Sequence, residues 1–141
     1  MSGTTRAYTG APFTLKLANY SLDSGETIRP DRIANGNLPS PWPDAWYDRT
    51  AFLSVPPGSY RFGNSGRNIL DGPGTFTFDM SLSRRFKLGE SQAFQFRAEC
   101  FNLSNRANLS LPQTQIDVLN AGVISLAKAP RIFQLGLRLE F

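Results

Sequence analysis

The sequence contains no histidine and only one cysteine, Cys100. The absence of histidine removes the commonest general base, the Ser-His-Asp triad and the usual ligand of transition metals. A single cysteine excludes a disulfide bond within the chain. We therefore expect no catalytic residue, no metal ligand and no cofactor-binding residue, and we expect that the protein is not an enzyme.

Long hydrophobic runs are also missing, and charged residues are few. No stretch approaches about 18 consecutive apolar residues, which excludes a transmembrane helix. Charged residues make up 18% of the chain, below the roughly one quarter that is usual in globular domains. The net charge is +4 without any run of Lys and Arg, so nucleic acid is not an expected partner.

Turn-forming and aromatic residues are abundant instead. The chain has 12 Gly, 10 Pro and 11 Phe, and frequent Gly and Pro indicate many turns. The C-terminal segment then alternates strictly, because every even position is polar or Gly and every odd position is apolar. The apolar positions are Phe133, Leu135, Leu137, Leu139 and Phe141. A period of two predicts an amphipathic β-strand.

Two further segments, residues 75–88 and 93–103, alternate in the same way. The short polar stretch 89–92 between them predicts a hairpin. A weaker candidate strand covers residues 12–20, and residues 123–127 can form one short strand. The predicted fold is therefore all-β, with about four antiparallel strands.

Three features favour a transmembrane barrel over a β-sandwich. The strands are about 11 to 14 residues long, whereas about 9–11 suffice to cross lipid and about 5–6 are usual in globular proteins. Long and short connections alternate, as external loops and periplasmic turns do. The polar faces also carry charges in mid-strand, which a barrel lumen accepts. The predicted lumen-facing residues are Asp79, Arg85, Arg97, Glu99 and Arg138.

The connection lengths also predict a direction for each strand. The turn at 89–92 is expected in the periplasm and the loops 21–74 and 104–129 outside the cell. Arg84 interrupts the apolar face near the turn, where it can snorkel to the headgroups or mark a β-bulge. By parity Cys100 faces lipid, as a small hydrophobe.

Four strands cannot close a barrel, and an open edge in lipid leaves unpaired backbone groups. We therefore expect residues 1–141 to be a C-terminal fragment of a longer barrel, without a plug domain. No signal peptide is visible at the N-terminus, although an outer-membrane protein needs one. Met1 is accordingly expected to be an internal start or an artificial boundary.

Several short motifs follow one another along the chain. They are residues 10–14, 29–31, 63–74, 79–82, 95–102 with Asn105, 130–131, Gln134 and Phe141. In order and spacing they resemble the C-terminal region of TonB-dependent, Oar-like outer-membrane transporters, which have a carboxypeptidase-regulatory-like N-terminal domain. The sequence departs from that pattern at Asp71, Cys100 and Arg106, where a basic residue, an aromatic and His are usual.

The resemblance implies the function and the partners. We expect the chain to form part of the wall of a transporter in the bacterial outer membrane, for a substrate that the sequence does not identify. The expected partners are membrane lipid, the rest of the barrel with its plug, TonB through the N-terminal part, and the barrel-assembly machinery, which would read the terminal strand as an assembly signal. The alternative is a soluble secreted β-sandwich or lectin-like binding module.

Other residue groups have both a functional and a structural explanation. Asp79 and Glu99 can be a catalytic carboxylate pair, but ion pairs with Arg in the lumen explain them better. Trp42, Trp46 and Tyr47 can stack on a sugar, and aromatic packing is the favoured alternative.

Two loop segments resemble ligand sites only superficially. Residues 63–74 have the glycines of a phosphate loop but not its Gly-Lys-Ser/Thr ending, so tight turns with Gly and Asn at positive φ are expected. Asp23, Glu26 and Asp31 match no EF-hand spacing and are expected to be solvated loop acids.

Overall fold

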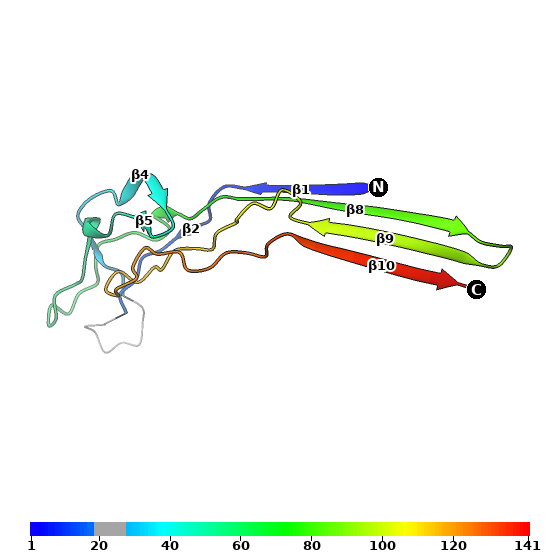
Figure 1. Ribbon diagram of the computed structural model, residues 1–141. Helices are drawn as coiled ribbons and strands as arrows, with labels where there is room; N and C mark the ends of the chain where they lie inside the picture. The colour runs from blue at the N-terminus through cyan, green and yellow to red at the C-terminus, as the bar shows by residue number, and fades with distance from the viewer. Residues whose placement is uncertain (19–27) are drawn as a thin grey trace. The chain divides into compact units, whose positions relative to one another are not determined.

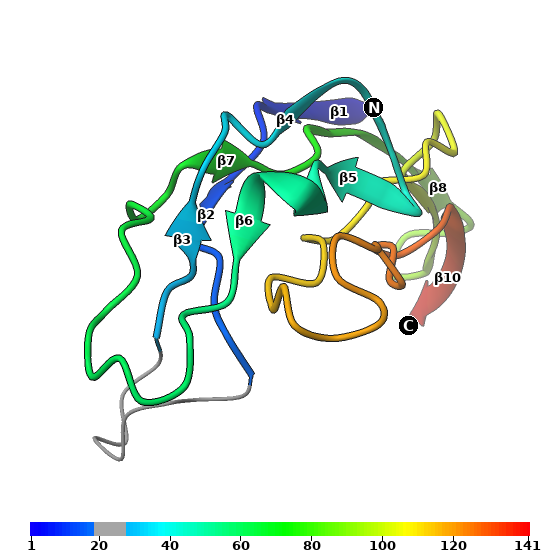
Figure 2. The same ribbon diagram turned by 90° about the vertical axis from the view of Figure 1, so that its left-hand side faces the viewer.

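The computed structural model describes residues 1–18 and 28–141, and these divide into two compact units (Figures 1 and 2). The sheet unit consists of Met1–Tyr8, Thr75–Asn108 and Lys128–Phe141. The loop unit consists of Thr9–Gly74 and Leu109–Ala127. Each unit therefore combines segments that are distant in the sequence.

The sheet unit is built on four antiparallel strands in the order β1-β8-β9-β10, which Figure 1 shows side by side. They are β1 (Ser2–Tyr8), β8 (Thr75–Lys87), β9 (Ala93–Phe101) and β10 (Ile132–Glu140). The last three strands confirm the predicted segments to within two residues at either end. The predicted pairing is also confirmed, because β9 lies between β8 and the terminal strand.

The connection between β8 and β9 is the predicted short hairpin. The backbone N–H of Leu88 donates to the carbonyl of Gln92 at 2.9 Å, and Gly89 N–H donates to the same carbonyl at 3.3 Å. The register then runs without a shift from Lys87 opposite Ala93 to Met80 opposite Cys100. A β-bulge at Arg84 is therefore excluded, and this residue stays on the apolar face with its guanidinium carbon 5.0 Å from the ring centre of Phe86.

The fourth strand is not the one that the alternation at residues 12–20 predicts. Only β2 (Pro12–Phe13) is a strand there, and it pairs with β7 (Leu70–Asp71) in the loop unit; residues 19–20 lie outside the described part. The sheet is completed by β1, whose apolar-side positions are Gly3, Thr5 and Ala7 opposite Met80, Phe78 and Phe76. Small side chains at these positions give no strong hydrophobic alternation.

The loop unit contains short pairings around a hydrophobic core. Besides β2 and β7 it has β3 (Asp31–Arg32) with β6 (Phe52–Leu53), β4 (Asn37–Trp42) with β5 (Ala45–Tyr47), and one 3-10 turn, Arg49–Ala51. The buried core residues are Phe13, Leu15, Leu17, Ile28, Tyr47, Ala51, Phe52, Val55, Leu70 and Ile116. Thus Phe13, Leu15 and Leu17 do alternate, but they face this core and not lipid.

Backbone hydrogen bonds join the two segments of the loop unit. Trp46 N–H donates to the carbonyl of Gly122 at 3.0 Å, and Ile124 N–H donates to the carbonyl of Pro43 at 2.7 Å. Residues 123–127 do not form the short strand that the sequence allows, and Ala127 makes only an isolated bridge with Leu109. Two loops that look irregular in sequence therefore fold together.

The glycines of residues 63–74 serve close packing more than turns. Asn68 has the expected positive φ, 53°, but the glycines of this stretch do not. Instead, a Cβ on Gly63 would collide with the carbonyl oxygens of Arg29 and Pro30. Backbone is packed against backbone here, which only glycine allows. Within the described ranges, no helix is long and apolar enough to cross a membrane.

Candidate functional site

The four strands give the sheet two chemically different faces. Side chains of a strand alternate between faces, and the register carries that alternation across all four strands. One face, which we call the polar face, holds all five residues predicted to face the lumen: Asp79, Arg85, Arg97, Glu99 and Arg138. The structure therefore brings these residues together on one side of the sheet.

The opposite, apolar face is largely uncovered in the sheet unit. On β10 it presents Phe133, Leu135, Leu137 and Leu139, and Leu135 is 75% exposed. Phe141 follows the strand and is 92% exposed. Cys100 lies on this face in register between Met80 and Phe133, but it is only 6% exposed. Exposed apolar area of this kind marks a surface that contacts lipid or protein.

Charges on the polar face are paired across and along the strands. Within β9, Arg97 donates from Nη2 to Glu99 Oε1 at 2.6 Å and from Nε at 2.9 Å. Glu140 on β10 accepts from Arg85 on β8, and its other oxygen lies 3.5 Å from Arg138 Nε. The guanidinium groups remain more than half exposed, so each pair contributes little to stability, roughly 0–1 kcal/mol.

The ion pair between Arg85 and Glu140 passes over the intervening strand β9. On the polar face the residue of β9 opposite Glu140 is Ala93. Arg85 lies opposite the neighbouring Gln95, so its long side chain reaches diagonally past the short methyl group of Ala93 to β10. Sequence alternation places Glu140 on the polar face but does not reveal its contact with Arg85.

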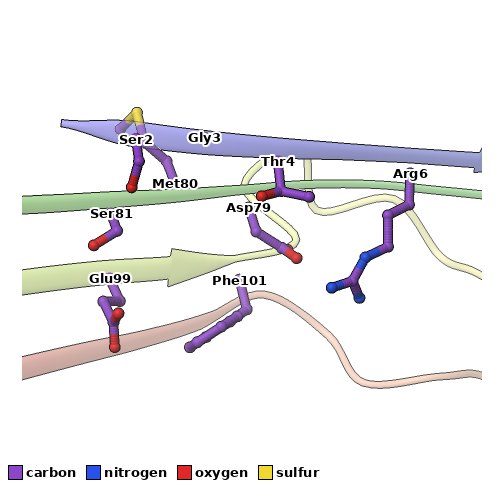
Figure 3. Close-up of a pocket in the computed structure, with 9 residues that line it drawn as sticks. All are labelled: Ser2, Gly3, Thr4, Arg6, Asp79, Met80, Ser81, Glu99 and Phe101. Atoms are coloured by element: carbon purple, nitrogen blue, oxygen red, sulfur yellow. The ribbon is translucent and has the colours of Figure 1, made fainter.

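A shallow hollow of about 190 Å³ opens on the polar face between β1, β8 and β9 (Figure 3). It is lined by Ser2, Gly3, Thr4, Arg6, Asp79, Met80, Ser81, Glu99 and Phe101. Figure 3 shows the Arg6 guanidinium and the Asp79 carboxyl directed toward one another, with the Phe101 ring beside them. Hydroxyls, charges of both signs and one ring can hold a polar ligand by hydrogen bonds and stacking.

Two buried asparagines organise the loop that follows β9. Asn102 N–H donates to Asp79 Oδ1 at 2.8 Å, and the Asn102 side chain donates to the Arg106 carbonyl at 3.0 Å. Asn108 accepts from Phe76 N–H at 2.8 Å and donates to the Phe76 carbonyl at 2.9 Å. Its amide thus pairs with β8 as a neighbouring strand would, a role that no pattern in the sequence indicated.

The loop aromatics that can stack on a sugar have mainly structural roles. Trp46 donates from Nε1 to the Asp71 carbonyl at 2.8 Å. The Tyr47 hydroxyl donates to the Gln113 carbonyl at 3.0 Å, and burial raises the Tyr47 pKa to about 12. Trp42 alone remains 58% exposed. Both Trp46 and Tyr47 also pack in or against the hydrophobic core, so aromatic packing, the favoured explanation, holds for these two residues.

Asp31 is not a free loop acid, because Arg61 binds it with both terminal nitrogens, at 2.8 and 2.6 Å. This hydrogen bonding holds the pKa of Asp31 below its ordinary value. Asp23 and Glu26, the other acids considered for calcium, lie outside the described residues. In residues 1–18 and 28–141, no three His, Cys, Asp or Glu side chains gather as metal ligands would.

An antiparallel sheet with long strands, one exposed apolar face and one charged face defines the class of transmembrane β-strand proteins. Comparison with known families agrees, since the outer membrane beta barrel domain matches residues 1–134. The chain belongs to this family, and it is a protein of the bacterial outer membrane. No curated protein and no solved structure matches it.

Sequence reasoning found the charges of β8, β9 and β10 but missed what β1 contributes. Ser2, Thr4 and Arg6 line the hollow, and all three come from a strand that the sequence did not predict. The available signal was the alternation of Thr4, Arg6 and Tyr8 with small residues. It is weak because Gly and Ala are poor markers of a strand.

Proposed function

We propose that this chain forms part of the wall of a TonB-dependent, Oar-like transporter in the outer membrane. The apolar face contacts lipid, and the polar face lines the lumen, where Asp79, Arg85, Arg97, Glu99 and Arg138 meet water and substrate. The observation that carries the proposal is the division of one continuous sheet into an apolar and a charged face. Residues 88–92 form a periplasmic turn in this arrangement, and the loop unit is extracellular.

The lumenal hollow supports a role in passage of a polar substrate. Arg6, Asp79, Ser81 and Phe101 offer donors, acceptors and a ring at one place on the face. An open site of this kind binds weakly, since little of a ligand would be buried. Weak contacts suit a transport path, where a ligand must leave as readily as it enters.

The proposal assigns no catalysis to the carboxylates of the lumen. Glu99 is bound by Arg97, and Asp79 accepts a backbone N–H from Asn102. Both carboxylates thus have structural partners.

The partners follow from the same arrangement. In the sheet, β1 and β10 are edge strands, and edges in lipid require pairing because unpaired backbone groups cost several kcal/mol each. We propose that further strands of the same barrel pair with both edges and that a plug fills the lumen. The barrel-assembly machinery would recognise the terminal strand through Phe133, Leu135, Leu137, Leu139 and Phe141.

Two measurements test the transporter type. The protein purified from outer membranes is inserted into planar lipid bilayers, where a plugged barrel is expected to conduct almost no ions until urea loosens the plug. The detergent-solubilised protein is also passed over the immobilised periplasmic domain of TonB, which is expected to retain it. A large conductance without urea, together with no retention on TonB, would indicate an open porin and refute the proposal.

A further inference from the structure

The apolar face of β10 does not determine how this strand is aligned with β9. Leu135, Leu137 and Leu139 lie opposite Ala98, Phe96 and Phe94. A shift by two residues keeps every side chain on its own face, because the period of a strand is two. Leu137 or Phe133 would then face Ala98, and the Leu and Phe side chains of β10 would still meet apolar partners, although the second shift also brings Arg131 opposite Cys100.

The polar face does distinguish the alternatives. In the observed register Arg138 lies opposite the neutral Gln95, and Gly136 lies opposite Arg97. If Leu137 moved opposite Ala98, Arg138 would come to face Arg97. Like charges directly opposite one another destabilise a sheet.

The shift in the other direction is unfavourable because it breaks the ion pair of Glu140 with Arg85. With Phe133 opposite Ala98, Arg138 would occupy the present place of Glu140, beside Arg85. Glu140 itself would move by about 7 Å along the strand, out of reach of Arg85. Only the observed register both keeps the pair of Glu140 with Arg85 and keeps Arg138 from facing Arg97.

We propose that the order of Arg138 and Glu140 sets the register of the C-terminal strand. Glu140 is a positioning residue that bridges β8 and β10 past Ala93; its pair with Arg85 disfavours one neighbouring register, and Arg138 disfavours the other. The apolar residues determine which side of β10 lies on the apolar face of the sheet, and these two charges determine how β10 is aligned with β9. The proposal rests on the sheet alone and does not depend on the transporter type.

The test exchanges the two charges in the protein assembled in outer membranes. The exchange variant Arg138→Glu with Glu140→Arg keeps composition, net charge and the apolar face unchanged. Register is read from disulfide yields between Ala98→Cys and one of three partners, in a Cys100→Ala background. Leu135→Cys reports the observed register, and Leu137→Cys and Phe133→Cys report the two shifted ones.

We expect the parent to form mainly the disulfide with Leu135→Cys. In the exchange variant the yield of this disulfide should fall relative to the shifted ones by about fivefold, the factor that corresponds to about 1 kcal/mol. Adding Arg85→Glu restores a pair of opposite charges with residue 140 and should restore the parent's ratio. Parent-like ratios in the exchange variant would overturn the proposal.

A second variant covers the case in which the exchange variant does not assemble. Glu140→Gln removes one charge and should lower the yield with Leu135→Cys, whereas Lys87→Gln is the matched control. Lys87 is a cation on the same face of β8, and it has no ion pair within the described part of the chain. Equal ratios in Glu140→Gln, Lys87→Gln and the parent, or an assembly defect of the exchange variant that Arg85→Glu does not repair, would refute the register role.

Discussion

At the scale of single residues, buried polar side chains replace backbone partners that the strands cannot supply. Asn108 is 1% exposed and gives Phe76 both an acceptor and a donor. Asn102 ties the end of β9 to Asp79 and to the loop that follows. Such groups are costly to remove, because a buried N–H or C=O without a partner costs more than an ordinary hydrogen bond contributes.

Replacing Asn108 by Ala is expected to destabilise the sheet unit. Phe76 would lose both of its side-chain partners, and each unsatisfied group costs about 1–3 kcal/mol. The measurement is urea unfolding of the detergent-solubilised protein, followed by its heat-modifiable mobility in gels. Asn120→Ala, at an exposed position, is the control. Similar unfolding midpoints for both variants would show that Asn108 does not support β8.

The ion pair of Asp31 and Arg61 predicts a pH-dependent stability of the loop unit. Because Arg61 lowers the pKa of Asp31, the pair stabilises the folded unit above the ordinary carboxyl pKa of about 3.9, and this stabilisation is lost as pH falls through the lowered value. Arg61→Gln should therefore make the unit more susceptible to protease at neutral pH. The difference from the parent should shrink as the pH falls below the ordinary carboxyl pKa and through the lowered value of Asp31.

Arg67→Gln is the control for this experiment, since Arg67 is an exposed cation of the same unit with no ion pair among the described residues. It should leave the protease susceptibility unchanged at both pH values. If Arg61→Gln differed from the parent equally at pH 7 and at pH 2–3, the effect would not come from the ionised Asp31.

At the scale of elements, alternation predicted the strands whose two faces differ strongly. β8, β9 and β10 carry Phe and Leu on one side and charges on the other, so each was found with its hairpin and pairing. β1 was missed because its apolar-side residues are Gly3, Thr5 and Ala7. The segment containing Phe13, Leu15 and Leu17 was assigned to the membrane wrongly, because period two reports burial on one side and does not distinguish lipid from a protein core.

The terminal strand is expected to depend on its last side chain for assembly. Phe141 is almost fully exposed, so its removal takes away little packing within the chain. An aromatic ring at the membrane interface is favoured, and we propose that the assembly machinery reads it. Phe141→Ala should therefore reduce the amount of heat-modifiable barrel in outer membranes several-fold. Leu88→Ala, an exposed apolar residue beside the turn, should reduce it much less, and equal yields for the two variants would exclude the assembly signal.

At the scale of the whole chain, the structure contains two kinds of hydrophobic surface. The loop unit buries its apolar residues in a core of its own. The sheet unit leaves the apolar side chains of β10 exposed, and membership in the outer membrane barrel family explains what covers them. Sequence alone indicated the membrane sheet but not the loop core. That core is assembled from segments almost 100 residues apart in the sequence. Backbone hydrogen bonds join these segments, such as the one from Lys16 N–H to the Thr114 carbonyl at 3.0 Å.

The central claim is that the apolar face contacts lipid and the polar face contacts water. Two adjacent, exposed residues of β8 lie on opposite faces, Leu82 on the apolar side and Ser83 on the polar side. Each is replaced by Cys in a Cys100→Ala background and given a nitroxide spin label in the protein in outer-membrane vesicles. Electron paramagnetic resonance then measures collisions with oxygen, which concentrates in lipid, and with a water-soluble nickel chelate. We predict that oxygen dominates at residue 82 and the chelate at residue 83, and the same ratio at both positions would contradict the account.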